Sequence, residues 1–94
     1  FMNLDKAKKR IAKQVKKGFK GYPQISIAYF GESSDFASEV IVTLTSEEDA
    51  EPQEQKLASN SDARKDEAIQ SVLVKIIERS NANTVTEISG TSII

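Results

Sequence analysis

The chain has 94 residues, of which 38% are hydrophobic and 29% are charged, and it contains neither cysteine nor histidine. This length and composition predict one globular domain spanning residues 1–94. The two missing residue types exclude disulfides, thiolate and imidazole metal ligands, and nucleophiles activated by histidine. The formal net charge of -1 conceals a basic N-terminal third and an acidic remainder.

The first predicted element is a helix that begins at Asn3 or Asp5 and ends near Lys17. Asparagine and aspartate are both typical caps of a helix N-terminus. Apolar residues recur at helical spacing and form one stripe: Leu4, Ala7, Ile11, Val15 and Phe19. Two glycines follow the stripe, and Pro23 forbids its continuation.

Two strands are predicted next, over residues 23–30 and 37–45, with a turn at residues 31–36 between them. β-Branched and aromatic residues alternate with smaller or polar ones, which is typical of half-buried strands. The short connection requires an antiparallel pair. The expected core side chains of the pair are Ile25, Ile27, Tyr29, Val40, Val42 and Leu44.

Residues 46–61 are polar and rich in acidic residues, and we expect them to form a mobile acidic loop. A second helix is predicted to begin at Ser61 or Asp62 and to stop at Asn81. Its apolar stripe comprises Ala68 or Ile69, then Val72, Leu73, Ile76 and Ile77. A short strand at residues 84–88 and a turn at residues 89–92 complete the predicted elements.

These elements predict a two-layer α+β fold of the order α-β-β-α-β. Each helix has a single apolar stripe, so both should cover one face of a three-stranded sheet. A right-handed crossover would leave the last strand parallel to the second. The last strand could lie beside the first strand or beside the second, and we favour a position beside the first, antiparallel to it.

The sheet face that the helices leave uncovered is the first candidate site. Its central residues are predicted to be Ala28, Phe30, Ile41 and Thr43, which form a weakly apolar surface. Such a surface suits self-association, including a homodimer, or an unknown protein partner. The alternative interpretation is an ordinary solvated sheet face.

The basic N-terminal helix is the second candidate site. Its possible polyanion contacts are Lys9, Arg10, Lys13, Lys16 and Lys17. Lysine and arginine on one helix suit the phosphates of nucleic acid. Because no aromatic residue is interleaved among them, we favour the alternative of a solvated face that balances the acidic remainder.

Acidic residues offer weaker candidates. The run from Glu47 to Glu51 lacks the fixed spacing that Mg²⁺ or Ca²⁺ requires, so we expect a solvated loop that pairs loosely with the basic helix. Glu54-Gln55-Lys56 has the acid-x-lysine pattern of nuclease sites, but its expected position in a loop argues against that chemistry. Asp62 to Glu67 could form an anion site at a helix N-terminus, but we favour the interpretation that they provide caps and local ion pairs. We expect no cofactor and no resident metal.

No apolar run approaches the roughly 20 residues of a membrane span, and the N-terminus lacks the apolar core of a secretory signal. Together with the absence of cysteine, these features predict a cytoplasmic protein that does not associate with membranes.

Four short segments resemble landmarks of a family of small uncharacterised bacterial proteins. They are Gly21-Tyr22-Pro23, Ile27-Ala28-Tyr29-Phe30-Gly31, Glu48-Asp49-Ala50-Glu51-Pro52 and Asp62-Ala63-Arg64-Lys65-Asp66. The resemblance runs from about residue 18 to residue 94 and implies no assigned activity. It also implies that a cysteine-containing tail would follow Ile94 in the natural protein, so the chain is expected to be truncated at its C-terminus.

The sequence therefore predicts a domain that binds rather than catalyses, as a protein-interaction or self-association module. The alternatives are nucleic-acid binding through the basic helix, and a fragment of a metal-binding protein whose ligands lie in the missing tail. An enzyme is a further alternative, which would need carboxylates and lysines that converge in a cleft.

Overall fold

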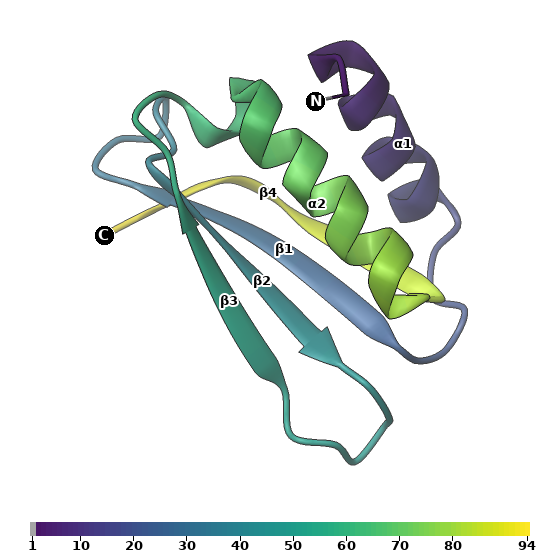
Figure 1. The fold of residues 1–94 in the computed structure, drawn as a ribbon. Helices are drawn as coiled ribbons and strands as arrows, with labels where there is room; N and C mark the ends of the chain where they lie inside the picture. Colours follow the sequence, from purple (N-terminus) through teal and green to yellow (C-terminus); the bar gives the residue numbers. More distant parts are fainter. Residues whose placement is uncertain (1) are drawn as a thin grey trace.

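The computed structural model describes residues 2–94 and has an α+β fold. The helices are α1 (Leu4–Lys16) and α2 (Glu67–Ser80), and a 3₁₀ turn, η1 (Ala63–Lys65), precedes α2. The strands are β1 (Gln24–Gly31), β2 (Glu39–Thr45), β3 (Gln53–Ala58) and β4 (Thr84–Ile93). They form one mixed sheet in the order β3-β2-β1-β4. Figure 1 shows both helices on the same face of this sheet, as predicted.

Helix α1 begins as the sequence indicates. The side chain of Asn3 accepts a hydrogen bond of 3.2 Å from the backbone N–H of Lys6 and so caps the helix. The helix ends before Gly18, whose φ of 71° is in the left-handed region that favours glycine. The predicted stripe is wrong at its end, because Phe19 lies beyond the last turn with 64% of its surface exposed. Its ring packs edge-on against Tyr22 instead.

Strands β1 and β2 form the predicted antiparallel pair, in a register that places Ile27 opposite Val42. Burial alternates along both strands, so every second side chain enters the core. The core face of the pair comprises the buried residues Ile25, Ile27, Tyr29, Val40 and Val42, with Leu44 partly buried.

The segment expected to be an unstructured connection contains a strand. Gln53 to Ala58 form β3, which pairs antiparallel with β2 at the edge of the sheet. Only Leu57 packs partly against the core, and the remaining side chains of β3 are exposed. The alternation of apolar residues that reveals a strand is therefore absent, and backbone pairing with β2 determines this strand.

Strand β4 lies beside β1, as predicted, but the predicted orientation was wrong. It runs parallel to β1 and therefore antiparallel to β2. The additional strand β3 reverses the direction of the chain once more before α2. This reversal is the reason that β4 runs opposite to the predicted direction. The expected turn at residues 89–92 is instead a continuation of β4 past a register shift, with Gly90 at a φ of 75°.

Helix α2 begins later than expected, because Asp66 and not Ser61 or Asp62 is its N-cap. It stops at Asn81, whose φ of 54° confirms the predicted left-handed cap. Four of its apolar residues are buried against α1 and the sheet: Ile69, Leu73, Val74 and Ile77. Among residues 2–94 there is no helix with the length and apolarity needed to span a membrane.

Candidate functional site

The predicted interaction face lies on the side of the sheet away from the helices. In β1 and β2 its residues alternate with the buried core residues, and Ala28 pairs with Ile41 in the centre of the sheet. Phe30 is paired with Glu39, and Thr43 with Ser26. The structure therefore brings the four predicted residues Ala28, Phe30, Ile41 and Thr43 onto one surface, where each is half-buried.

Charged residues of both signs border this surface along β3. Lys56 is paired with Ile41 and Glu54 with Thr43, so both lie on the same side of the sheet as the interaction face. The Lys56 ammonium forms an ion pair of 3.2 Å with Glu39. Glu54-Gln55-Lys56 is thus on a strand, contrary to the expected loop.

The strand position does not complete a nuclease site. Glu39 is paired with Ala58 and Glu54 with Thr43, so the two carboxylates stand four positions apart along the ladder. Four positions span about 13 Å at 3.3 Å per residue, too far for two oxygens to share one metal ion. Within residues 2–94 no group of three or more acidic side chains is arranged so that it could hold a metal ion.

The predicted polyanion contacts lie along α1. Of these, only Arg10 forms an ion pair in the described part of the chain, with Glu78 at 3.4 Å. Lys13 and Lys17, together with Arg10 and Glu78, line a cleft of about 250 Å³ between α1 and α2. The remaining two predicted contacts are exposed, Lys9 and Lys16.

The acidic run from Glu47 to Glu51 lies in the connection between β2 and β3. None of its carboxylates forms an ion pair with α1 among residues 2–94. Figure 1 shows this connection at the end of the sheet remote from α1. The loose pairing between the acidic run and the basic helix, which the sequence suggested, is therefore not present.

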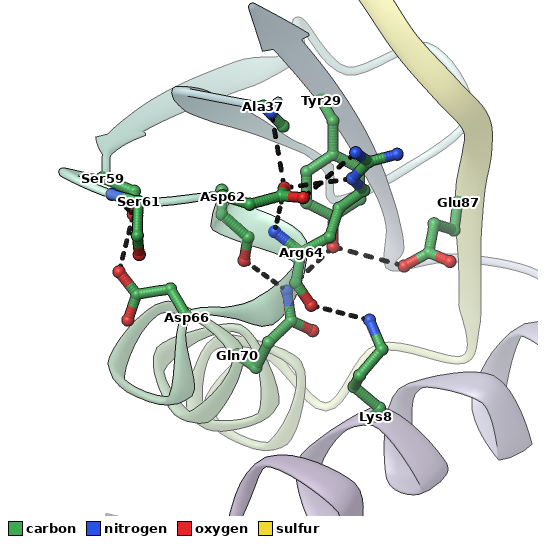
Figure 2. Close-up of polar contacts among 11 residues, drawn as sticks. Lys8, Tyr29, Ala37, Ser59, Ser61, Asp62, Arg64, Asp66, Gln70 and Glu87 are labelled. Carbon is green, nitrogen blue, oxygen red and sulfur yellow. Dashed lines mark hydrogen bonds and ion pairs between the residues drawn. The ribbon is translucent and has the colours of Figure 1, made fainter. Parts of the chain in front are cut away.

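A polar network that sequence reasoning did not assemble lies between η1, α2 and the sheet (Figure 2). Its centre is Asp62, which is 8% exposed. Its Oδ1 accepts from the backbone N–H of Ala37 at 3.3 Å and from Arg64 Nε at 3.1 Å, and its Oδ2 accepts from Arg64 Nη2 at 3.1 Å. The Arg64 guanidinium lowers the pKa of Asp62 below its ordinary value of 3.8.

Gln70 and Tyr29 extend this network into the core. Gln70 is 1% exposed, and its Nε2 donates to the Tyr29 hydroxyl at 3.0 Å and to the carbonyl oxygen of Ala63 at 2.9 Å. The Tyr29 hydroxyl donates in turn to Glu87 Oε2 at 3.5 Å. Burial raises the pKa of Tyr29 to about 12, because it disfavours the phenolate.

Asp66 occupies the other end of the network and caps α2. Its Oδ1 accepts from the backbone N–H groups of Ala68 at 3.0 Å and Ile69 at 3.2 Å, and its Oδ2 accepts from Ser59 Oγ at 2.6 Å. The hydrogen bond from Ser59 lowers the pKa of Asp66. The residues from Asp62 to Asp66 therefore have the capping and pairing roles that the sequence favoured, although the pair is largely buried.

A second cleft lies on the opposite side of α1 and has a volume of about 390 Å³. Gln70 and Ile11 are its buried residues. Its exposed lining comprises Asp5, Lys8, Lys9, Ala12 and Glu87. The Lys8 ammonium also donates a hydrogen bond of 2.8 Å to the carbonyl oxygen of Arg64, which ties α1 to the polar network. The sequence reasoning assigned no role to Gln70 or Glu87.

One sequence signal pointed to Gln70. It precedes Leu73, Val74 and Ile77 by three, four and seven positions, so it lies on the buried stripe of α2. A glutamine on such a stripe requires hydrogen-bond partners inside the protein. Glu87 offered no such signal, because its neighbours come from β1 and α1, which are remote in the sequence.

Comparisons of the chain with protein-family models, with curated proteins and with solved structures find no match. The resemblance to a family of small bacterial proteins therefore stays a prediction.

Proposed function

We propose that the domain is a non-catalytic interaction module that binds a second copy of itself through the open face of its sheet. The observation that carries this proposal is the one-sided packing of the two helices. Their buried residues lie on the core face, so no described segment covers Ala28, Phe30, Ile41 and Thr43. Two such faces can pack about 10 Å apart as a β-sandwich.

The border of the face favours a second copy over an unrelated partner. A two-fold axis brings the same patch of both chains together, so the patch must complement itself. Lys56 and Glu54 carry opposite charges on the same strand and face. Ala28, Ile41 and Lys56 form one row across the sheet, and Ser26, Thr43 and Glu54 form the next row on the same face. Two antiparallel copies with their two-fold axis between these rows would place Lys56 of one chain near Glu54 of the other.

Light scattering after size exclusion tests this proposal. At high protein concentration the mass should approach twice the 10.4 kDa of one chain. Ile41→Lys should yield a monomer, because it places a charge at the centre of the face. Ile93→Lys is the matched control, since Ile93 is 61% exposed at the end of β4 and lies outside the face. A monomeric wild-type chain at high concentration contradicts the proposal.

Polyanion binding by α1 is a second candidate, and a specific observation favours it. The acidic run between β2 and β3 forms no ion pair with α1 among residues 2–94, and Lys13 and Lys17 line one cleft with Arg10 and Glu78. Glu78 pairs with Arg10, and neither Lys13 nor Lys17 forms an ion pair among residues 2–94, so their charges are available to phosphates, with affinity that falls as salt rises.

A titration with duplex RNA and duplex DNA at two salt concentrations tests this candidate. A variant with Lys13→Gln and Lys17→Gln should bind more weakly and show a shallower dependence of affinity on salt. Lys75→Gln on α2 is the control, because Lys75 is exposed and lies outside the cleft. Absence of binding at low salt rules the candidate out.

A further inference from the structure

The cleft beside α1 is lined by a buried glutamine whose amide oxygen accepts no hydrogen bond from the described residues. Both hydrogens of the Gln70 amide have acceptors, Tyr29 Oη and Ala63 O. A carbonyl oxygen accepts but does not donate, so the bond to Ala63 fixes which end of the amide is the nitrogen. Gln70 Oε1 accepts no hydrogen bond from residues 2–94, although the residue is only 1% exposed.

This acceptor belongs to the cleft, because Gln70 is one of its buried lining residues. Figure 2 shows the Gln70 amide on the side of the polar network that faces Lys8, with Glu87 nearby on β4. Lys8 does not satisfy Gln70, because its ammonium donates to Arg64 O. A ligand in the cleft can therefore donate to Gln70 Oε1 without displacing a donor of the protein.

The charges around the cleft define the ligand further. Lys8 and Lys9 supply two positive charges, and Asp5 and Glu87 supply two negative charges. A cleft that has positive and negative charges side by side suits a ligand that carries one charge of each sign. Ile11 and Ala12 add an apolar wall, and the volume of about 390 Å³ is within the usual range for small-molecule sites.

We propose that this cleft binds a small zwitterion, a free amino acid or a dipeptide. Its ammonium group donates to Gln70 Oε1 and Glu87, and its carboxylate accepts from Lys8 and Lys9. Its aliphatic side chain packs on Ile11 and Ala12. The site is on the helix side of the sheet, so it is independent of the proposed self-association through the open face.

NMR titration of the isotope-labelled full chain tests the proposal. The probes are alanine and alanylalanine, together with N-acetylalanine and alaninamide, each of which lacks one of the two charges. We expect saturable shifts at Gln70 and Glu87 with alanine or alanylalanine, and the better of the two identifies the class. Each blocked ligand should bind about tenfold more weakly or worse, since a hydrogen bond to a charged group is worth at least that factor.

Two variants complete the test. Glu87→Gln keeps an acceptor for the Tyr29 hydroxyl and should weaken binding of the zwitterion by about tenfold. Glu78→Gln is the control, because Glu78 faces the other cleft and should leave binding unchanged. Equal affinity for zwitterions and blocked ligands, or no saturable shift with either zwitterion, overturns the proposal. So does a Glu87→Gln variant that binds as well as the wild-type chain.

Discussion

The guanidinium of Arg64 and the carboxylate of Asp62 form two hydrogen bonds of 3.1 Å each, although only one residue separates them in the sequence. The same carboxylate accepts from the backbone N–H of Ala37 at 3.3 Å, and Ala63 donates its own N–H to Ala37 O. The pair therefore joins the turn between β1 and β2 to the segment before α2, with Asp62 buried and Arg64 half-buried.

Asp62→Ala should lower the free energy of unfolding by about 3 kcal/mol, because it leaves the Arg64 guanidinium and the Ala37 N–H without their acceptor. Urea unfolding measures this change. Asp49→Ala is the control, since Asp49 is exposed in the connection between β2 and β3, and it should change the stability by less than about 0.5 kcal/mol. Equal loss in the two variants would contradict the role of Asp62.

Acid should destabilise the fold by protonating the carboxylates of Asp62 and Asp66. The pKa values of Asp62 and Asp66 are lowered, chiefly by hydrogen bonds from Arg64 and Ser59 respectively. A carboxyl with a lower pKa in the folded state stabilises it above its unfolded pKa, here 3.8. That contribution is lost as the pH falls below 3.8 through the folded-state pKa.

Unfolding free energies measured from about pH 6 down to about pH 2 test this linkage. The wild-type chain should lose stability through the acid range, and a chain with Asp62→Asn and Asp66→Asn should lose less of it. The double variant should be less stable at neutral pH, where both native carboxylates are ionised. Parallel pH profiles for the two chains would show that other groups control the acid response.

Tyr29 should ionise unusually late. Its pKa is raised to about 12 from the ordinary 10.0, mainly because the phenol is buried. In a Tyr22→Phe variant, absorbance reports Tyr29 alone, and its midpoint should lie near 12 while circular dichroism still shows a folded chain. The stability that Tyr29 contributes is complete below 10.0 and is lost as the pH rises through about 12. A midpoint near 10.0 in the folded chain would refute the burial of its hydroxyl.

Gly31 is required by a close approach of two backbone segments. A Cβ atom at this position would overlap the carbonyl group of Phe36. Gly31→Ala should therefore cost about 1–3 kcal/mol, as overpacking does elsewhere, and thermal unfolding measures it. Ser33→Ala in the same turn is exposed and should be nearly neutral. Equal midpoints for Gly31→Ala and the wild-type chain would mean that the turn moves aside freely.

The spacing of apolar residues correctly predicted the elements that bury one apolar face. Both helices and the pairing of β1 with β2 follow from stripes and alternation, and the caps Asn3 and Asn81 follow from residue type. The sequence did not reveal β3 because the strand has only two apolar residues. Leu57 is partly buried, and the neighbouring Ala58 is exposed. That omission reversed the predicted direction of β4, since each missed strand changes the direction of the chain once.

The candidate sites also differ in whether a local sequence pattern reveals them. Alternation in β1 and β2 predicts that the residues of the proposed interaction face lie on one side of the sheet, as they do in the structure. The Asp62–Arg64 pair was visible only as a local capping segment, because its burial depends on Ala37 in a distant turn. The cleft with Gln70 and Glu87 joins α1, α2 and β4, and no local pattern brings these three elements together.

The central claim is that the open sheet face is where two copies meet, and an NMR dilution series of the labelled chain tests it most directly. We predict that chemical shifts change with concentration at Ala28, Phe30, Ile41 and Thr43, while the core-facing residues Ile27 and Val42 and the exposed face of α1 stay constant. Shifts that do not depend on concentration, or that move along α1 instead of the sheet, would contradict the account.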